Sequence, residues 1–303
     1  MFRSLRVKHR PQCPDDPNAG SCGRTEPQSP NGPRPVLRVR VERWDGQTAQ
    51  GWGSLADGAY AIINLASESI AGGRWTPALK RWIRESRLAA GAAVVEAVAA
   101  APPKPYLVVQ ASGVGYYGPY GNEEITEGSP PGANFLSWLA IEWEGATTPV
   151  EDMGVRRMVV RAGVALSKEG GALPRLMLPF RFFIGGPLEN GRQWVTWIHI
   201  ADEVRVIRWL MEDPDTRESY NLVAPNPVSN AQLARALGRV LGRPVWLPIS
   251  AVALRLLLGE MSSVLLTGQR AVPRRLLEEG FVFRFPDRED ALTDLLRDGS
   301  GAR

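Results

Sequence analysis

Tyr106-Leu-Val-Val-Gln-Ala-Ser-Gly-Val-Gly-Tyr-Tyr-Gly118 is the stretch that decides the fold of this 303-residue chain. It begins with a short apolar run and passes directly into a glycine-rich turn. A run of this kind, bounded by turn residues, is typical of a strand that is buried on both faces of a parallel sheet. Similar runs predict three more strands, at residues 60–65, 157–161 and 220–223.

Helical patterns separate these predicted strands. Thr76 as N-cap and Pro77 at the first helical position predict a long helix that runs to about residue 101. A second helix is predicted from about Asn134, and Asp202 and Asn230 are predicted to be the N-caps of two more. Strands that alternate with helices indicate an α/β fold with a doubly wound parallel sheet.

The chain divides into three predicted parts: an arm over residues 1–35, an α/β domain over 36–248, and a small, mostly helical C-terminal domain over 249–303. In the last part, helices are predicted at 251–259 and 262–279, with a final short helix near the end. The arm is proline-rich and without periodicity, so we expect it to be disordered. It carries the only cysteines, Cys13 and Cys22, which we expect to be free thiols.

Charge and hydropathy exclude two classes of protein. The formal net charge is +4, but residues 1–40 carry a net +5 and the remainder a net −1, which excludes a basic nucleic-acid-binding body. No uninterrupted apolar run of about 18 residues is present, which excludes a transmembrane helix, and the arm lacks the apolar core of a secretory signal. We therefore expect a cytoplasmic protein with neither nucleic acid nor a membrane as partner.

The turn after residue 111 has the spacing of a dinucleotide-binding motif, with glycines at 113, 115 and 118. The residues that follow begin with Pro119 and are rich in helix breakers, so no helix N-terminus would face a pyrophosphate. Ser112 could instead donate to a substrate carbonyl, and Tyr116 or Tyr117 could stack on a ligand or transfer a proton. The alternative is a tight loop whose tyrosines pack as half-buried aromatic residues.

The histidines predict neither a metal site nor a hydrolase triad. His9 and His199 are the only two in the chain, and neither has cysteines at a zinc-ligand spacing. Gln110 stands where the nucleophile elbow of a hydrolase would need a glycine. The simplest interpretation of His199 is structural, with Asp202 capping the helix that follows.

Several motifs, in matching order and spacing, resemble those of one enzyme family. They are Asn64-Leu-Ala-Ser-Glu-Ser-Ile-Ala-Gly-Gly-Arg-Trp-Thr76, Ser112-Gly-Val-Gly-Tyr-Tyr-Gly118, Gly185-Gly-Pro-Leu188, Gly191-Arg-Gln-Trp-Val-Thr-Trp-Ile-His199, Ala224-Pro-Asn-Pro-Val228 and Leu256-Leu-Leu-Gly-Glu-Met261. Over about residues 41–297 the chain resembles the atypical, extended short-chain dehydrogenase/reductases. Within them it is most similar to the NAD(P)-dependent epimerase-like subfamily that ends in a domain of unassigned function.

The resemblance implies a Rossmann-like domain that binds NADP or NAD, and an epimerase- or dehydratase-like oxidoreductase that acts on an unidentified small molecule. It assigns Ser112 to the active-site serine position, with Tyr117 or Tyr116 as the only local phenols able to replace the usual proton donor. The residues implied to lie beside the cofactor are Asn64, Leu65, Ala66, Ser67, Ala111, Arg161 and Gly163. The loop implied to close the substrate side contains Gln193, Trp197 and His199.

Two departures from the family pattern bear on activity. The helix that would carry a Tyr-x-x-x-Lys pair reads Leu139-Ala-Ile-Glu-Trp143, with neither residue. Nothing before residue 36 resembles the family's first strand, G-x-x-G-x-x-G turn and helix, so we expect impaired cofactor binding. An out-of-frame reading or a misplaced start codon would produce such a junction. The alternative function is a non-catalytic nucleotide-sensing or partner-binding protein on the same fold, since relatives have carried a cell-division-inhibitor label.

Overall fold

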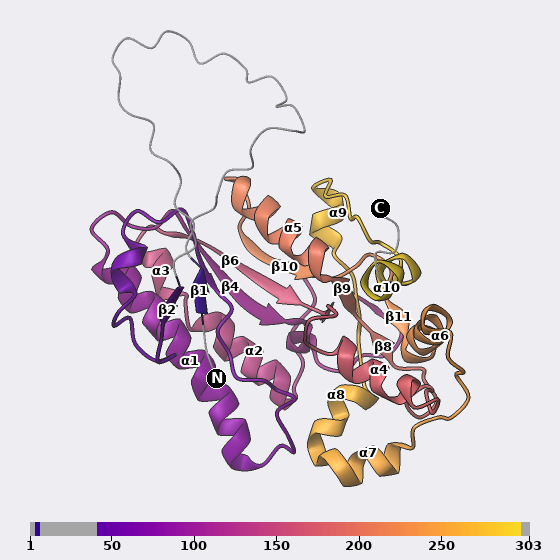
Figure 1. The fold of residues 1–303 in the computed structure, drawn as a ribbon. Helices are drawn as coiled ribbons and strands as arrows, with labels where there is room; N and C mark the ends of the chain where they lie inside the picture. Colours follow the sequence, from indigo (N-terminus) through magenta and orange to yellow (C-terminus); the bar gives the residue numbers. More distant parts are fainter. Residues whose placement is uncertain (1–3, 7–40, 298–303) are drawn as a thin grey trace.

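The structure, a computed structural model, describes residues 4–6 and 41–297. Its central sheet has four parallel strands in the order β10-β6-β4-β3 (Figure 1). These strands are β3 (Ile62–Asn64), β4 (Leu107–Gly113), β6 (Arg156–Ala162) and β10 (Glu218–Leu222). Each overlaps one of the four runs predicted to be a strand, which confirms the parallel α/β sheet.

Helices cover both faces of the sheet, as a doubly wound fold requires. On one face, α1 (Pro77–Ala100) and α3 (Pro149–Asp152) contribute to a core that contains Val108 of β4. On the other face, α5 (Ile200–Glu212) and α9 (Arg274–Glu278) contribute to a core that contains Val109. Because neighbouring residues of a strand point to opposite faces, β4 is buried on both sides.

Two of the predicted helix starts are confirmed. Thr76 caps α1, because its side-chain oxygen accepts a hydrogen bond from the backbone N–H of Leu79 at 3.1 Å. Asn134 caps α2 (Phe135–Gly145) in the same way, accepting from the N–H of Ser137 at 2.9 Å. Both side chains satisfy a backbone donor that the first helical turn leaves without a partner.

The other two predicted N-caps are wrong. The cap of α5 is His199, and the cap of α6 (Asn230–Leu241) is Ser229, which forms a capping box. Asp202 is fully buried inside the first turn of α5, and its carboxylate accepts backbone N–H bonds from residues 284 and 285. Asp202 therefore binds a segment about 80 residues away in the sequence and does not cap the helix, although the local pattern predicts that it would.

The long helix predicted over 262–279 is also wrong. After α7 (Ala251–Leu258), the chain forms a 3-10 turn, Gly259–Ser262, and the short helix α8 (Ser263–Leu266). It then becomes extended in β12 (Arg270–Ala271) before α9 and the final helix α10 (Arg288–Leu296). Gly268 and Pro273 lie on either side of β12 and interrupt helical structure there.

The C-terminal segment shares its cores with the sheet. Leu276, Phe281 and Phe283 belong to the cluster that also contains Val109 of β4 and Leu222 of β10. The α10 helix packs against α6 in a second shared cluster. The domain boundary at residue 248 stays a prediction.

The remaining elements are short. β7 (Val164–Leu166) pairs with β9 (Trp197–His199), β8 (Trp194–Val195) with β11 (Val228–Ser229), and β5 (Glu124–Ile125) with β12. A helix, α4 (Leu173–Arg181), and two 3-10 turns, Gly53–Ala56 and Val114–Tyr117, complete this part of the chain. Part of the arm predicted to be disordered forms a strand: β1 (Ser4–Arg6) pairs with β2 (Val41–Arg43), which follows the arm. The rest of the arm, with Cys13 and Cys22, lies outside the described residues.

Candidate active site

The carboxyl ends of β3, β4 and β6 bring together most of the residues predicted to bind cofactor or to act in catalysis (Figure 1). Ser112 is the register partner of Arg161 across β4 and β6, and Asn64 is the partner of Gln110 across β3 and β4. This edge is where open α/β sheets bind ligands.

A buried ion pair forms the centre of this edge. Arg161 donates two hydrogen bonds to Glu144 of α2, Nε to Oε1 and Nη2 to Oε2, each at 2.9 Å. The side chains are only 7% and 13% exposed, so water screens the pair poorly. Burial alone would lower the pKa of Arg161, but the hydrogen bonds and the charge of Glu144 outweigh it and raise this pKa above its ordinary value.

Ser112 joins the same carboxylate. Its hydroxyl donates to Oε1 of Glu144 at 2.6 Å, and the residue is almost fully buried. A serine hydroxyl has one proton and two acceptor lone pairs. In this arrangement the proton of Ser112 is therefore directed to Glu144 rather than toward a ligand.

The two candidate tyrosines both contact the ion pair. Tyr117 is fully buried; its hydroxyl donates to Oδ1 of Asn221 at 2.8 Å and accepts from Nη1 of Arg161 at 3.0 Å. Burial raises the pKa of this phenol, although the charge of Arg161 opposes the shift. The ring of Tyr116, which is half-buried, lies with its centroid 3.5 Å from Cζ of Arg161. Tyr116 is thus the more accessible of the two phenols.

Sequence reasoning missed three residues of this network: Glu144, Asn221 and Glu127. Glu127 is buried, accepts the backbone N–H of Asn221 at 3.1 Å, and has its pKa raised by burial. A glutamate near the end of an amphipathic helix has the pattern of a solvated residue. Only the three-dimensional placement of α2 against the carboxyl end of β6, where Arg161 lies, identifies Glu144 as its partner.

Hydrogen bonds fix both ends of the short segment after β3, at residues 64 and 68. Asn64 is buried and donates from Nδ2 to Oε1 of Gln110 at 3.0 Å. Four residues later, the N–H of Glu68 donates to Oγ of Ser86 at 3.0 Å, and its carbonyl oxygen accepts from Nη1 of Arg87 at 3.1 Å. The predicted cofactor residues Leu65, Ala66 and Ser67 therefore lie between two fixed points, and Leu65 is exposed.

Arg87 of α1, a buried residue, clamps the segment by its hydrogen bond to the carbonyl of Glu68. It is 5% exposed, its guanidinium carbon lies 4.6 Å from the ring centroid of Trp143, and burial lowers its pKa to about 10. Its Nη1 also donates to the carbonyl of Ile83 at 2.8 Å. The side chain thus ties α1 to the backbone of the segment that follows β3.

Beyond β6, Gly163 allows two backbones to approach closely. A Cβ atom at this position would lie 2.7 Å from the carbonyl oxygen of Thr196, a distance that real Cβ atoms do not show. Ala111, also predicted beside the cofactor, is half-buried on β4. The segment after β3 is accessible and the turn after β6 is closely packed. Together they are suited to hold part of a dinucleotide. For the pyrophosphate, however, the described residues place no glycine-rich turn between a strand and a helix beside β3.

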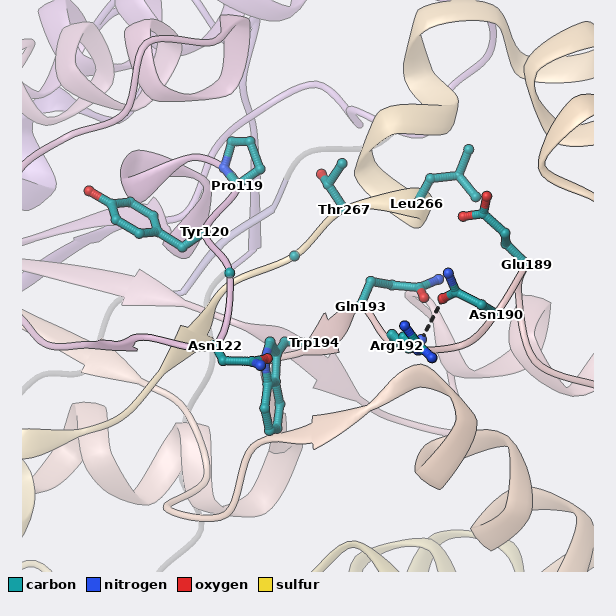
Figure 2. Close-up of a pocket in the computed structure, with 12 residues that line it drawn as sticks. Pro119, Tyr120, Asn122, Glu189, Asn190, Arg192, Gln193, Trp194, Leu266 and Thr267 are labelled. Atoms are coloured by element: carbon teal, nitrogen blue, oxygen red, sulfur yellow. Dashed lines mark hydrogen bonds between the residues drawn. The ribbon is translucent and has the colours of Figure 1, made fainter.

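A cavity of about 410 Å³ lies next to the tyrosine turn (Figure 2). Its walls come from the 119–122 loop, the 189–194 loop and the 266–268 stretch of the C-terminal segment. Figure 2 shows Trp194 beside Asn122, to which its Nε1 donates at 3.1 Å. Amide groups and Arg192 among the lining residues make the cavity suitable for a polar ligand.

Of the three residues predicted on the substrate side, only Gln193 lines this cavity. Trp197 is fully buried and donates from Nε1 to the carbonyl of Asn226 at 3.2 Å. His199 is buried, stacks on Phe285 with ring centroids 4.0 Å apart, and has Nε2 3.3 Å from Oδ2 of Asp294. Burial lowers the pKa of His199, and the charge of Asp294 opposes this. Trp197 and His199 are therefore core residues and do not line the cavity.

The described residues form neither a metal site nor a membrane-spanning helix. Over residues 4–6 and 41–297, no group of three or more His, Cys, Asp or Glu residues is placed to hold a metal ion. In the same part of the chain, no helix has both the length and the apolar character needed to cross a membrane.

Comparison with known proteins decides the family. The chain is 39% identical over 248 residues to the chloroplastic epimerase family protein SDR39U1 homolog of Arabidopsis thaliana, covering 81% of this chain and 71% of that protein. It is 41% identical over 237 residues to epimerase family protein YfhF of Bacillus subtilis, covering 78% of each. The chain belongs to this epimerase family.

Solved structures of the epimerase family share the fold. Human epimerase family protein SDR39U1 (isoform 2), in a crystal structure with NADPH, is 34% identical with a TM-score of 0.76, covering 79% of this chain and 82% of that one. A nucleoside-diphosphate sugar epimerase from Corynebacterium glutamicum is 32% identical with a TM-score of 0.68, covering 88% of this chain and 51% of that one. Residues 249–295 match a family described as a domain of unknown function, DUF1731. Both parts of the resemblance inferred from the motifs are confirmed.

Proposed function

We propose that this chain binds NADP(H) along the carboxyl ends of β3, β4 and β6 and acts as an oxidoreductase of the epimerase family on a small polar molecule. The observation that carries the proposal is the convergence at one sheet edge of Ser112, the clamped segment after Asn64, and Gly163. The human relative, whose crystal structure contains NADPH, supports the choice of cofactor. The Corynebacterium relative makes nucleoside-diphosphate sugars the first substrates to test.

In this proposal each group of residues has a distinct task. The backbone of Leu65, Ala66 and Ser67 would run beside the dinucleotide, and the turn at Gly163 would leave room for it. A bound nicotinamide supplies the hydride acceptor or donor. Ser112 would hydrogen-bond the substrate oxygen, which requires its hydroxyl proton to turn away from Glu144. The cavity in Figure 2 would receive the polar remainder of the substrate.

The second candidate function is nucleotide binding without catalysis. It is favoured by the state of the candidate proton donors: the hydroxyl of Tyr117 is buried and donates to Asn221, and that of Ser112 donates to Glu144. Tyr116 is the remaining phenol of the turn and would have to supply the proton of any carbonyl reduction. NADPH binding with no turnover across a panel of carbonyl compounds and nucleotide sugars would favour this second function.

Binding is tested first, by titrating the purified protein with NADPH and following tryptophan fluorescence. We expect saturable quenching, because Trp143 lies against Arg87 beside the proposed cofactor segment. Arg87→Met should weaken binding about tenfold, since it releases the carbonyl of Glu68. The matched control is Arg84→Met, one turn earlier on α1 and paired with Glu142 at the surface; it should bind as the unmodified protein does. Absence of saturable quenching both in this chain and in a variant with a glycine-rich turn added would refute the cofactor assignment.

The expected impairment of cofactor binding has its own test. A variant that carries a glycine-rich strand–turn–helix in front of residue 41 should bind NADPH more tightly than the unmodified chain, because backbone N–H groups at such a turn hold phosphate. Equal affinity of the two proteins would show that the phosphates need no such turn here.

A further inference from the structure

A group of large apolar side chains is exposed around the end of α4 and along α7. After α4, Phe182, Phe183 and Ile184 are 67%, 51% and 47% exposed. In and before α7, Trp246, Val252 and Leu256 are 64%, 61% and 71% exposed. We call these six residues the apolar face. Apolar groups in such number on a surface indicate an interaction site.

The two halves of the apolar face are joined by direct contacts. Trp246 donates from Nε1 to the carbonyl of Phe183 at 2.9 Å, and its backbone N–H donates to the carbonyl of Gly185 at 3.1 Å. Five residues after Trp246 the chain enters α7, where Val252 and Leu256 are one turn apart and share a side of the helix. Figure 1 shows α7 and α4 at the same end of the molecule.

Arginines outnumber carboxylates around the apolar face, at whose edges Glu189 and Glu260 lie. Residues 170–188 and 219–259, which contain the whole face, include no Asp or Glu. Arg181, Arg243 and Arg255 are exposed, and no carboxylate of the described residues lies within ion-pair distance of them. The guanidinium carbon of Arg243 lies 4.3 Å from the ring centroid of Phe183. The face therefore combines exposed aromatic and aliphatic groups with three arginines that form no ion pair with a carboxylate of the described residues.

We propose that the apolar face docks on the surface of a bilayer that contains anionic lipid. Trp and Phe side chains partition to the boundary between headgroups and acyl chains, and arginines beside them bind lipid phosphates. A second copy of the chain is the poorer occupant, because like-charged arginines would meet across a two-fold interface. Such a peripheral contact leaves no long apolar run in the sequence, which is why the sequence predicts no membrane partner.

The test is sedimentation of the full chain with vesicles of phosphatidylcholine alone and of phosphatidylcholine mixed with phosphatidylglycerol. The protein should sediment with the mixed vesicles, weakly or not at all with the neutral ones, and less as salt rises, because salt screens the arginines. Reversing one charge, in Arg181→Glu or Arg243→Glu, should weaken binding at least fivefold, the equivalent of about 1 kcal/mol for each basic residue at a lipid surface. Phe182→Ser with Trp246→Ser should abolish it.

Matched controls lie on α1 and α2, outside the apolar face. Trp138→Ser on α2 removes a tryptophan of similar exposure, 61%, and Arg81→Glu reverses an exposed charge on α1; both should leave sedimentation unchanged. Circular dichroism confirms that each variant is folded. Vesicle binding that survives the substitutions in the apolar face would place the lipid contact elsewhere in the chain and overturn the proposal. Absence of binding together with a dimer in analytical ultracentrifugation would overturn it in favour of a second copy.

Discussion

Glu144→Gln should destabilise the protein strongly, although it changes a carboxylate to an amide of the same shape. Arg161 would keep its charge in a site where its side chain is only 7% exposed, and would lose the carboxylate that accepts two of its hydrogen bonds and balances its charge. Breaking a buried pair by removing one member costs about 3 to 5 kcal/mol. For a body of this size that cost corresponds to a fall in Tm of about 6 to 20 °C.

The matched control lies two residues away on the same helix. Glu142 accepts two hydrogen bonds from Arg84, at 2.6 and 2.7 Å, in the same paired geometry. Those side chains are 47% and 40% exposed, so water solvates whichever charge remains when its partner is removed. Glu142→Gln should therefore cost at most about 1 kcal/mol. Because helix, geometry and substitution are alike, the difference between the two variants measures the effect of burial.

Urea unfolding followed by tryptophan fluorescence gives the free energy of unfolding for each variant. The double variant Glu144→Gln, Arg161→Gln removes both charges. Its loss in free energy of unfolding should be smaller than the sum of the losses in the two single variants. A cost below about 1 kcal/mol for Glu144→Gln, or strict additivity in the double variant, would show that Arg161 and Glu144 are not coupled as the structure indicates.

Three further predictions concern the stability of the scaffold. Thr76→Ala should lower the free energy of unfolding by about 1 kcal/mol, whereas Ser250→Ala, at a helix start without a side-chain cap bond, should leave it unchanged in the same urea assay. The pKa of His199 is lowered in the fold, so the unfolded chain binds more protons below about pH 6.5 and stability should fall as the pH drops through that value. His199→Asn, which retains a capping side chain, should flatten this part of a stability–pH profile, and an unchanged slope would contradict the assignment. Gly268→Ala should cost about 2 kcal/mol or more because its Cβ would overlap the carbonyl oxygen of Trp194, while Gly128→Ala, with open space around it, serves as the control in thermal melts.

The sequence predicts the sheet well because each buried parallel strand is an apolar run that owes little to distant residues. The start of α1 is predictable for the same reason: Thr76 and its partner, Leu79, are three residues apart. Asp202 shows where this reasoning fails. Its side chain has the chemistry of an N-cap, but it is taken by backbone donors at residues 284 and 285, which no local pattern reveals.

The candidate site is predictable in its strand-end residues and not in their partners. Ser112 and Arg161 follow from motif resemblance, and the β4–β6 register places them side by side. Motif resemblance does not identify Glu144, because its role depends on how α2 packs against the sheet. Trp197 and His199 show the converse: they carry the resemblance, yet they are buried and do not line the cavity.

The position of Leu276, Phe281 and Phe283 within the core beneath β4 and β10 has a consequence for how the protein is made. The last strand of the sheet ends at Leu222, so one face of the sheet lacks part of its cover until the chain has been synthesised past Phe283. Contacts that join residues so far apart in sequence also slow folding, since the intervening chain must be brought together first. We therefore expect the nascent chain to depend on chaperones that shield apolar surface, and a chain stopped before residue 276 to aggregate rather than accumulate as a smaller folded protein.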